Sequence, residues 1–152
     1  MNDSLDVAVR ELPAVRVALL EYQAEGRARE YGPDIGMMYR DVEGWLKHLG
    51  YKTDSLRRFG VPFNEGSRLQ SYWCCVEAPE GLTEGKGKMQ VRELAAGRYA
   101  VLLLHKDSET VGPALRRFYD EYAPAHGLVP DETRPLYEVY HPESMEYRIP
   151  VR

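Results

Sequence analysis

The residue in this sequence best suited to chemistry is a glutamate in an aromatic and apolar segment, Glu138 within Arg134–His141. Aromatic and β-branched residues after a proline are typical of a β-strand, in which alternate side chains share a face. Leu136 and Tyr140 would then share the face of Glu138, and Tyr137 would lie on the other. A carboxylate among such neighbours costs stability unless water, a hydrogen-bond donor or a cation compensates it. We therefore expect Glu138 to form the floor of a small-molecule cleft, with a solvated strand glutamate as the alternative interpretation.

A carboxylate surrounded by aromatic rings is suited to a hydrophobic, planar or lipophilic cation. Partial burial strengthens the Coulomb attraction, and each ring face adds a cation–π contact of about 0.5–2 kcal/mol. The aromatic residues that we expect on strands near the cleft are candidate ligand contacts together with Glu138: Trp73, Tyr99, Tyr137 and Tyr140. For most single tyrosines the simpler interpretation is an amphipathic strand residue with its hydroxyl group in water.

Two similar segments show an internal repeat, which organises the rest of the chain. Val9–Leu20 and Val91–Leu102 are identical at most of their aligned positions. In both, a short extended stretch meets a break, at Pro13 or Gly97, and an apolar strand follows. The sequence therefore predicts a first repeat over about 7–78, a connector over about 79–88 and a second repeat over about 89–152, within a single domain of residues 1–152.

Each repeat is expected to form a β-α-β-β unit. An apolar stripe at helical spacing from Ile35 to Leu49 predicts the first helix, which Pro33 and Asp34 begin. A matching stripe from Val111 to Tyr122 predicts the second. Strands joined by short turns follow each helix, among them Arg68–Glu77 in the first half and Tyr147–Val151 as the final strand. The sequence thus predicts an α+β fold with pseudo-twofold symmetry, an antiparallel sheet with two helices packed on it, and a cleft between the repeats where ligands commonly bind.

The symmetry also suggests a partner for the glutamate. Laying Tyr72–Cys74 on Tyr137–Val139 places Trp73 opposite Glu138. In that alignment Trp73 faces the same cleft.

Composition excludes several classes of protein. The net charge of −4 and the absence of a dense Lys/Arg stripe argue against direct nucleic-acid binding. No apolar run approaches the roughly 20 residues that cross a bilayer, and the acidic N-terminus does not resemble a signal peptide, so we expect a cytoplasmic protein. The four histidines are scattered, so we expect neither a metal site nor a cofactor. Cys74 and Cys75 are adjacent and are expected to be buried thiols.

The order of these motifs resembles the GyrI-like small-molecule-binding family. The motifs are Val9–Pro13, its echo Val91–Val101, the strand Tyr137–Tyr140 and the closing Ile149–Val151. That family includes effector-binding domains of multidrug-responsive transcription regulators and stand-alone gyrase-inhibitory proteins. The resemblance implies a duplicated fold with a cleft in which Glu138 is the acid that meets cationic drugs. No helix-turn-helix precedes Val7 in this sequence, so we expect a stand-alone binding protein that senses or sequesters such a compound.

Two other functions stay open. Some members of the family hydrolyse strained, cyclopropane-type electrophiles, and Glu138 would then be the general base of a hydrolase. A protein-interaction role like that of the gyrase-inhibitory members is the third possibility, with an unknown protein partner. No nucleophile–base pair is visible in the sequence, so a binding protein is favoured over an enzyme.

Overall fold

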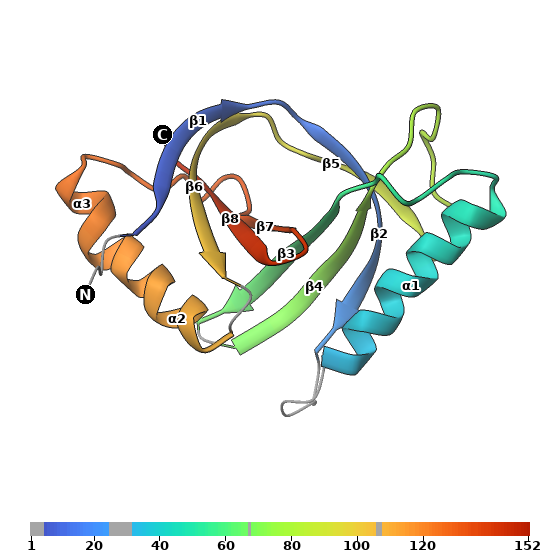
Figure 1. Cartoon of the computed structure of the whole chain (residues 1–152), viewed down its shortest axis with the longest axis horizontal. Coiled ribbons are helices and arrows are strands. Elements are labelled where there is room, and N and C mark those ends of the chain that lie inside the picture. The colour runs from blue at the N-terminus through green and yellow to red at the C-terminus, as the bar shows by residue number, and fades with distance from the viewer. Residues whose placement is uncertain (1–4, 25–31, 67, 106–107) are drawn as a thin grey trace. The chain divides into compact units, whose positions relative to one another are not determined.

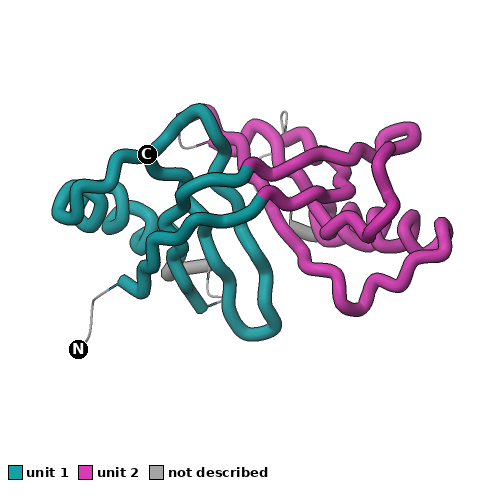
Figure 2. Tube along the Cα trace, turned by 90° about the horizontal axis from the view of Figure 1, so that it is seen from above, with its two compact units in different colours: residues 1–13, 96–152 teal, residues 14–95 magenta. Residues whose placement is uncertain are grey.

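The computed structural model describes residues 5–24, 32–66, 68–105 and 108–152, and the chain divides into two compact units. Unit 1 comprises Met1–Pro13 and Ala96–Arg152, and unit 2 comprises Ala14–Ala95 (Figure 2). Each unit contains antiparallel strands and a helical segment, which confirms the predicted α+β class.

Unit 2 is a four-stranded antiparallel sheet with one helix packed on it. Its strands lie in the order β3-β4-β2-β5 (Figure 1). Its elements are β2 (Val15–Gln23), α1 (Gly32–His48), β3 (Arg58–Glu65), β4 (Arg68–Glu77) and β5 (Gln90–Leu94). The helix lies on the sheet because the apolar stripe of α1, with Val42 and Leu46 fully buried, packs against Ala18 and Val76. The predicted first helix is therefore confirmed.

Unit 1 has the same kind of sheet with a different helical segment. Its strands lie in the order β1-β6-β8-β7 (Figure 1). Its elements are β1 (Val7–Leu12), β6 (Gly97–His105), α2 (Ser108–Arg117), η1 (Phe118–Tyr122), α3 (Ala123–Ala125), β7 (Tyr137–Tyr140) and β8 (Ser144–Pro150). Phe118 and Ala123 pack on Ala100 and Leu102 of β6, so one face of this sheet is covered by the helical segment.

The predicted second helix is interrupted by a turn of π-helix, η1. The backbone N–H of Ala123 donates to the carbonyl of Phe118, five residues back rather than four. The next residue, Pro124, has no N–H, and its ring would clash with the carbonyl of Asp120 in a regular α-helix. The apolar stripe from Val111 to Tyr122 predicted a helix with a buried face, but it did not indicate the π-helical turn.

The opening stretch of each sequence half is a full strand, and it pairs with the other half of the chain. β1 pairs with β6, ending at the pair Leu12 and Gly97, whereas β5 pairs with β2, beginning at Val15 and Leu94. Each half is thus β-β-α-β-β rather than β-α-β-β. Each compact unit consequently contains the first strand of the other half, a pairing that the sequence halves did not indicate.

Candidate functional site

Glu138 is a buried carboxylate held by two tyrosine hydroxyl groups. The residue is 7% exposed. The hydroxyl of Tyr140 donates to one carboxylate oxygen at 2.6 Å, and the hydroxyl of Tyr147 donates to the other at 2.9 Å. Hydrogen bonds to an ionised acceptor are stronger than neutral ones, so these two offset part of the desolvation cost.

The β7–β8 hairpin creates this arrangement. The backbone N–H of His141 donates to the carbonyl of Ser144 at 2.9 Å and closes the turn. The register that follows places Glu138 directly across from Tyr147. Directly opposed residues of antiparallel strands share a face, and Tyr140 lies on that face as well because it is two residues from Glu138. Strand geometry thus aims both hydroxyl groups at one carboxylate.

The Tyr147 hydroxyl is fixed as a hydrogen-bond donor. Burial, and then the negative charge of Glu138, raise the pKa of Tyr147 far above its ordinary value. The phenol therefore stays protonated at any physiological pH.

A cavity of about 250 Å³ lies in unit 1 near Glu138 and Tyr147. Its described lining is Tyr119, Pro130, Asp131, Glu132, Arg134, Leu136, Ile149 and Pro150. Leu136 precedes Glu138 by two residues, and Ile149 follows Tyr147 by two. Leu136, Tyr147 and Ile149 belong to one apolar cluster. Because the strand rise is about 3.4 Å per residue, this part of the cavity wall lies about 7 Å along the strands from the carboxylate.

Two of the predicted contacts, Tyr99 and Tyr137, form a separate cluster. Their rings meet edge to face with centroids 5.6 Å apart, and both side chains are fully buried. The guanidinium of Arg148 donates to the Tyr137 hydroxyl at 3.2 Å. Strand alternation puts Tyr137 on the face of β7 opposite to Glu138, whereas Tyr140 lies on the same face as Glu138 and donates to its carboxylate. A ligand contact by Tyr99 or Tyr137 stays a prediction.

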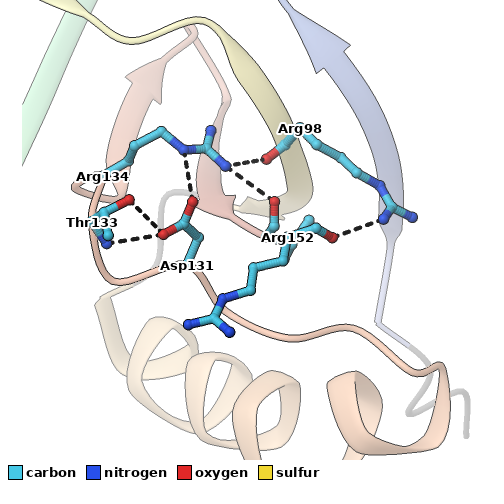
Figure 3. A network of polar contacts seen from close by, with 6 residues as sticks. Arg98, Asp131, Thr133, Arg134 and Arg152 are labelled. Atoms are coloured by element: carbon cyan, nitrogen blue, oxygen red, sulfur yellow. Dashed lines mark hydrogen bonds and ion pairs between the residues drawn. The ribbon is translucent and has the colours of Figure 1, made fainter.

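Arg134 connects the residues after β8 to the cluster of Tyr99 and Tyr137. Figure 3 shows its polar contacts with Asp131 and Arg98. The guanidinium of Arg134 lies over the ring of Tyr99, 4.8 Å from the centroid, and pairs with Asp131 at 3.2 Å. It also donates to the backbone carbonyls of Arg98 and Val151, at 3.2 and 3.0 Å. The loop before β7, the start of β6 and the residues after β8 are therefore joined by one side chain.

Glu146 forms a charged group on the same face of β8 as Arg148. It contacts His141 at 2.9 Å and Arg148 at 3.1 Å. Burial raises the pKa of Glu146, but the hydrogen bonds from His141 and Arg148 outweigh it and hold the pKa below its ordinary value. This carboxylate is consequently occupied by partners within unit 1.

The symmetry argument that paired Trp73 with Glu138 is wrong. Trp73 lies on β4, the last strand before the connector, whereas Glu138 lies on β7, the last strand but one. The cross-strand neighbours of Trp73 are Glu21 and Val61. Its indole N–H donates to Glu21 at 3.1 Å, so the ring is held within unit 2. A role for Trp73 in ligand binding stays a prediction that no longer has symmetry as support.

Other chemistries receive little support from the described residues. Both cysteines are buried, and burial raises the pKa of the Cys74 thiol to about 12 and that of Cys75 well above its ordinary value. They are therefore protonated and poor nucleophiles. The part of the chain that the structure describes contains no cluster of metal-ligating side chains. Its helices are too short or too polar to span a bilayer.

Sequence reasoning missed Tyr147, which is more buried than Tyr140 and also donates a hydrogen bond to Glu138. The signal was present, because the turn at Pro142–Glu143 implies a hairpin, and counting outward from that turn pairs Glu138 with Tyr147. The final strand was predicted to begin at Tyr147 rather than Ser144, and this late start concealed the pairing.

Comparison with known proteins gives a family and several similar folds. The family model of the GyrI-like small molecule binding domain matches residues 5–152. No curated protein matches the chain in sequence.

Three solved structures illustrate the fold similarity. The first is EcmrR in a DNA complex, with a TM-score of 0.72, 11% identity and coverage of 97% of this chain, which spans 57% of that one. The second is a hydrolase from Listeria innocua, with a TM-score of 0.67, 12% identity and coverage of 97% and 92%. The third is SAV2435 bound to tetraphenylphosphonium, with a TM-score of 0.58, 16% identity and coverage of 97% and 94%.

Proposed function

The chain belongs to the GyrI-like small-molecule-binding domain family, and from this premise we propose that it binds hydrophobic cations at Glu138. The observation that carries the proposal is the buried carboxylate between the hydroxyl groups of Tyr140 and Tyr147. A buried acid is costly, and a protein keeps one where a charge is needed.

The arrangement suits a cation whose charge is spread over a large apolar body. Such an ion loses little hydration on entering a partly buried site, and its attraction to the carboxylate grows as the local dielectric falls. The rings of Tyr140 and Tyr147 stand beside the carboxylate, and each ring face adds a cation–π contact of about 0.5–2 kcal/mol. Glu138 therefore supplies the charge, and the tyrosines supply both orientation and ring surface.

The neighbouring cavity offers space for an apolar group of the ligand. An apolar cavity of about 150 Å³ is enough to hold benzene, so the volume of about 250 Å³ beside Leu136 and Ile149 accommodates a single substituted ring. A ligand with its charge at Glu138 and one ring about 7 Å away would use both features.

A neighbour in fold supports the ligand class. SAV2435, whose structure contains tetraphenylphosphonium, has this fold over nearly all of the chain. Tetraphenylphosphonium is a hydrophobic cation with four rings around a delocalised charge. We propose a ligand of the same chemical class for this chain, which would act as a sensor or as a sequestering protein.

The test is ligand-dependent thermal stabilisation. Tetraphenylphosphonium should raise the melting temperature of the protein, and its neutral analogue triphenylphosphine oxide should do so much less. Glu138→Gln keeps the shape of the side chain and removes its charge, and we expect the affinity for the cation to fall at least about tenfold. Glu143→Gln, in the exposed turn after β7, is the matched control and should bind like the parent. Equal affinity of the Glu138→Gln variant and the parent would refute the charge role.

A hydrolase is the second candidate, and the hydrogen-bonded pair of Tyr147 and Glu138 favours it. In that reaction Glu138 takes a proton from water as the water oxygen bonds to a ring carbon of a cyclopropane-type electrophile. The ring C–C bond breaks, and its electron pair moves into the attached conjugated system, which then takes up a proton. Turnover followed by mass spectrometry, absent in both Glu138→Gln and Tyr147→Phe, would support the enzyme. Binding without turnover in the parent protein would exclude it for that substrate.

A further inference from the structure

We propose that the groove between the end of β2 and α1 in unit 2 binds an extended basic peptide segment of another protein. The groove has a volume of about 450 Å³. Its described lining is Glu21, Tyr22, Gln23, Asp34, Met37, Met38 and Asp41. It lies wholly within unit 2, on residues other than those that hold Glu138, so the proposal is independent of the cation site.

One wall of the groove is the open edge of β2. β5 pairs with β2 only as far as Leu19, whereas β4 continues to pair with β2 as far as Gln23. Beyond Leu19, no described strand lies on the side of β2 away from β4. Open strand edges are where extended peptides add to a sheet.

The direction of the backbone groups along this edge follows from two hydrogen bonds. The carbonyl of Arg16 accepts from Ala78, which follows β4, and the N–H of Ala24 donates to Gln70 of β4. Even-numbered residues of β2 therefore direct their backbone groups at β4. Alternation in an antiparallel ladder then directs those of Glu21 and Gln23 away from β4, toward the groove. These two residues offer two N–H donors and two carbonyl acceptors to an added strand.

The other wall, on α1, provides contacts for the side chains of such a strand. Met37 is 57% exposed, and flexible, polarisable methionines suit surfaces that accept varied apolar groups. Asp41 lies one turn further along α1 and is exposed. Side chains of an added strand that point toward α1 would meet Met37, Met38 and Asp41.

The negative charge of the groove favours a positively charged partner. Three of the described lining residues are acidic, Glu21, Asp34 and Asp41, and none is basic. The Glu21 carboxylate is held in place by Gln23 at 2.6 Å and by Trp73 at 3.1 Å. Open backbone groups at a strand edge bind an extended chain. The carboxylates of Glu21 on the β2 wall and of Asp41 on the α1 wall attract Lys or Arg in that chain. A peptide with basic residues at intervals satisfies both requirements, whereas a small cation would leave the strand edge unused.

The experiment measures binding of the fluorescein-labelled peptide (Lys-Val)4 by fluorescence anisotropy. We expect saturable binding, and we expect no binding of (Glu-Val)4. Peptides N-methylated at every second amide, made in both registers, should differ, because only one set of amides would face β2. No saturable binding of the basic peptide up to about 1 mM, the weakest affinity of interest here, or equal binding of the acidic peptide, would overturn the proposal.

Two variants with matched controls locate the site. Asp41→Lys should weaken binding about tenfold or more, and Asp54→Lys, an exposed acid outside the groove, should leave it within about twofold. Gln23→Pro removes one donor from the open edge without breaking a bond to β4, so it should weaken binding also, whereas Gln23→Ala should not. Circular dichroism and urea unfolding check that each variant is folded. Equal affinity of the folded Asp41→Lys and Asp54→Lys variants for the basic peptide would overturn the assignment.

Discussion

The two units have the same strand pairing. Among the residues that the structure describes, only unit 1 carries a buried charged side chain on the sheet face that its helical segment covers. In unit 1, Tyr147 of β8 lies between Leu102 of β6 and Glu138 of β7. In the repeat alignment Leu102 of β6 matches Leu20 of β2, so the same place can be found in unit 2.

In unit 2, Leu20 pairs with Cys74 of β4, and Cys74 pairs with Gly60 of β3. A thiol and a glycine thus occupy the positions of the phenol and the carboxylate. The face of unit 2 is apolar at this point and joins the cluster under α1. The same strand arrangement therefore accommodates two kinds of side chain. In unit 2 these positions are part of the apolar packing, and in unit 1 they hold Glu138 and its hydrogen-bond partner Tyr147.

The largest effect should come from giving unit 2 the charge of unit 1. Gly60→Glu would place a carboxylate beside Cys74, a fully buried residue of the hydrophobic cluster under α1, where the carboxylate would lose its water. We expect a loss of about 3–5 kcal/mol in the free energy of unfolding, measured in urea. Gly60→Ala adds a methyl group without charge and isolates the cost of the carboxylate. A variant as stable as the alanine control would show that the position in unit 2 is not dry.

The next effect concerns the break at the start of the repeated strands. Gly97 in unit 1 matches Val15 in unit 2, and Gly97 has φ +148, a conformation that side chains disfavour. A Cβ there would approach the Arg134 guanidinium within 2.4 Å, and that group is held by three hydrogen bonds and the Tyr99 ring. Gly97→Val should cost about 2–4 kcal/mol by urea unfolding.

The reverse substitution in unit 2, Val15→Gly, is compared with Gly97→Val. Val15→Gly should cost less, about 1–3 kcal/mol, because it removes a buried side chain without backbone strain. Equal costs for the two variants would argue that Arg134 moves aside freely.

A smaller effect separates the two hydroxyl groups around Glu138. Tyr147→Phe leaves a buried carboxylate oxygen without its donor and should cost about 1–3 kcal/mol. Tyr140→Phe should cost less, because Tyr140 is only partly buried and water can replace its hydroxyl group. Urea unfolding of both variants, of Glu138→Gln and of the double variant Glu138→Gln/Tyr147→Phe measures the coupling between Glu138 and Tyr147. An additive double variant would mean that the hydrogen bond contributes nothing.

The smallest effect is a shared sensitivity to acid. In unit 2 the hydrogen bond from Arg57 lowers the pKa of Glu77, and in unit 1 His141 and Arg148 lower that of Glu146 against the opposing effect of burial. A carboxyl with a lowered folded-state pKa stabilises the protein above its unfolded value, about 4.3 for glutamate. That stability is lost as the pH falls through the folded-state pKa.

Replacing each carboxylate should therefore flatten the decline of stability below about pH 4.5. We expect Glu77→Gln and Glu146→Gln each to reduce the change by less than about 1 kcal/mol, because both ion pairs are partly exposed. Melting temperatures across the acid range provide the measurement. An unchanged slope in both variants would mean that other groups govern acid unfolding.

Most of the elements could be predicted from local patterns. The stripe from Ile35 to Leu49 predicted a helix close to the observed one, and Arg68–Glu77 was predicted as a strand with the observed bounds. The π-helical turn before Pro124 and the exchange of opening strands were not predictable in this way. The missing N–H of Pro124 matters only in the context of the complete helix. Pairing between strands that are distant in sequence leaves no local pattern.

The candidate site was predictable in part for the same reason. Glu138 stood out because a charge in an apolar strand is a local anomaly. The alignment of Tyr72–Cys74 with Tyr137–Val139 rested on a single shared tyrosine, which is too little to match strands. It placed Trp73 of β4 opposite Glu138 of β7, although these strands do not occupy equivalent positions in the two halves.

The sequence by itself determined that Glu138 lies on a strand among apolar residues and that two related segments begin the halves of the chain, since both follow from residue type and spacing along the chain. The tertiary structure decided that Tyr147 and Tyr140 hold the carboxylate and that Cys74 and Gly60 occupy the matching place in unit 2. It also decided that β5 pairs with β2 only as far as Leu19. Those facts depend on hydrogen-bond register between strands, which is fixed only when distant segments pack together.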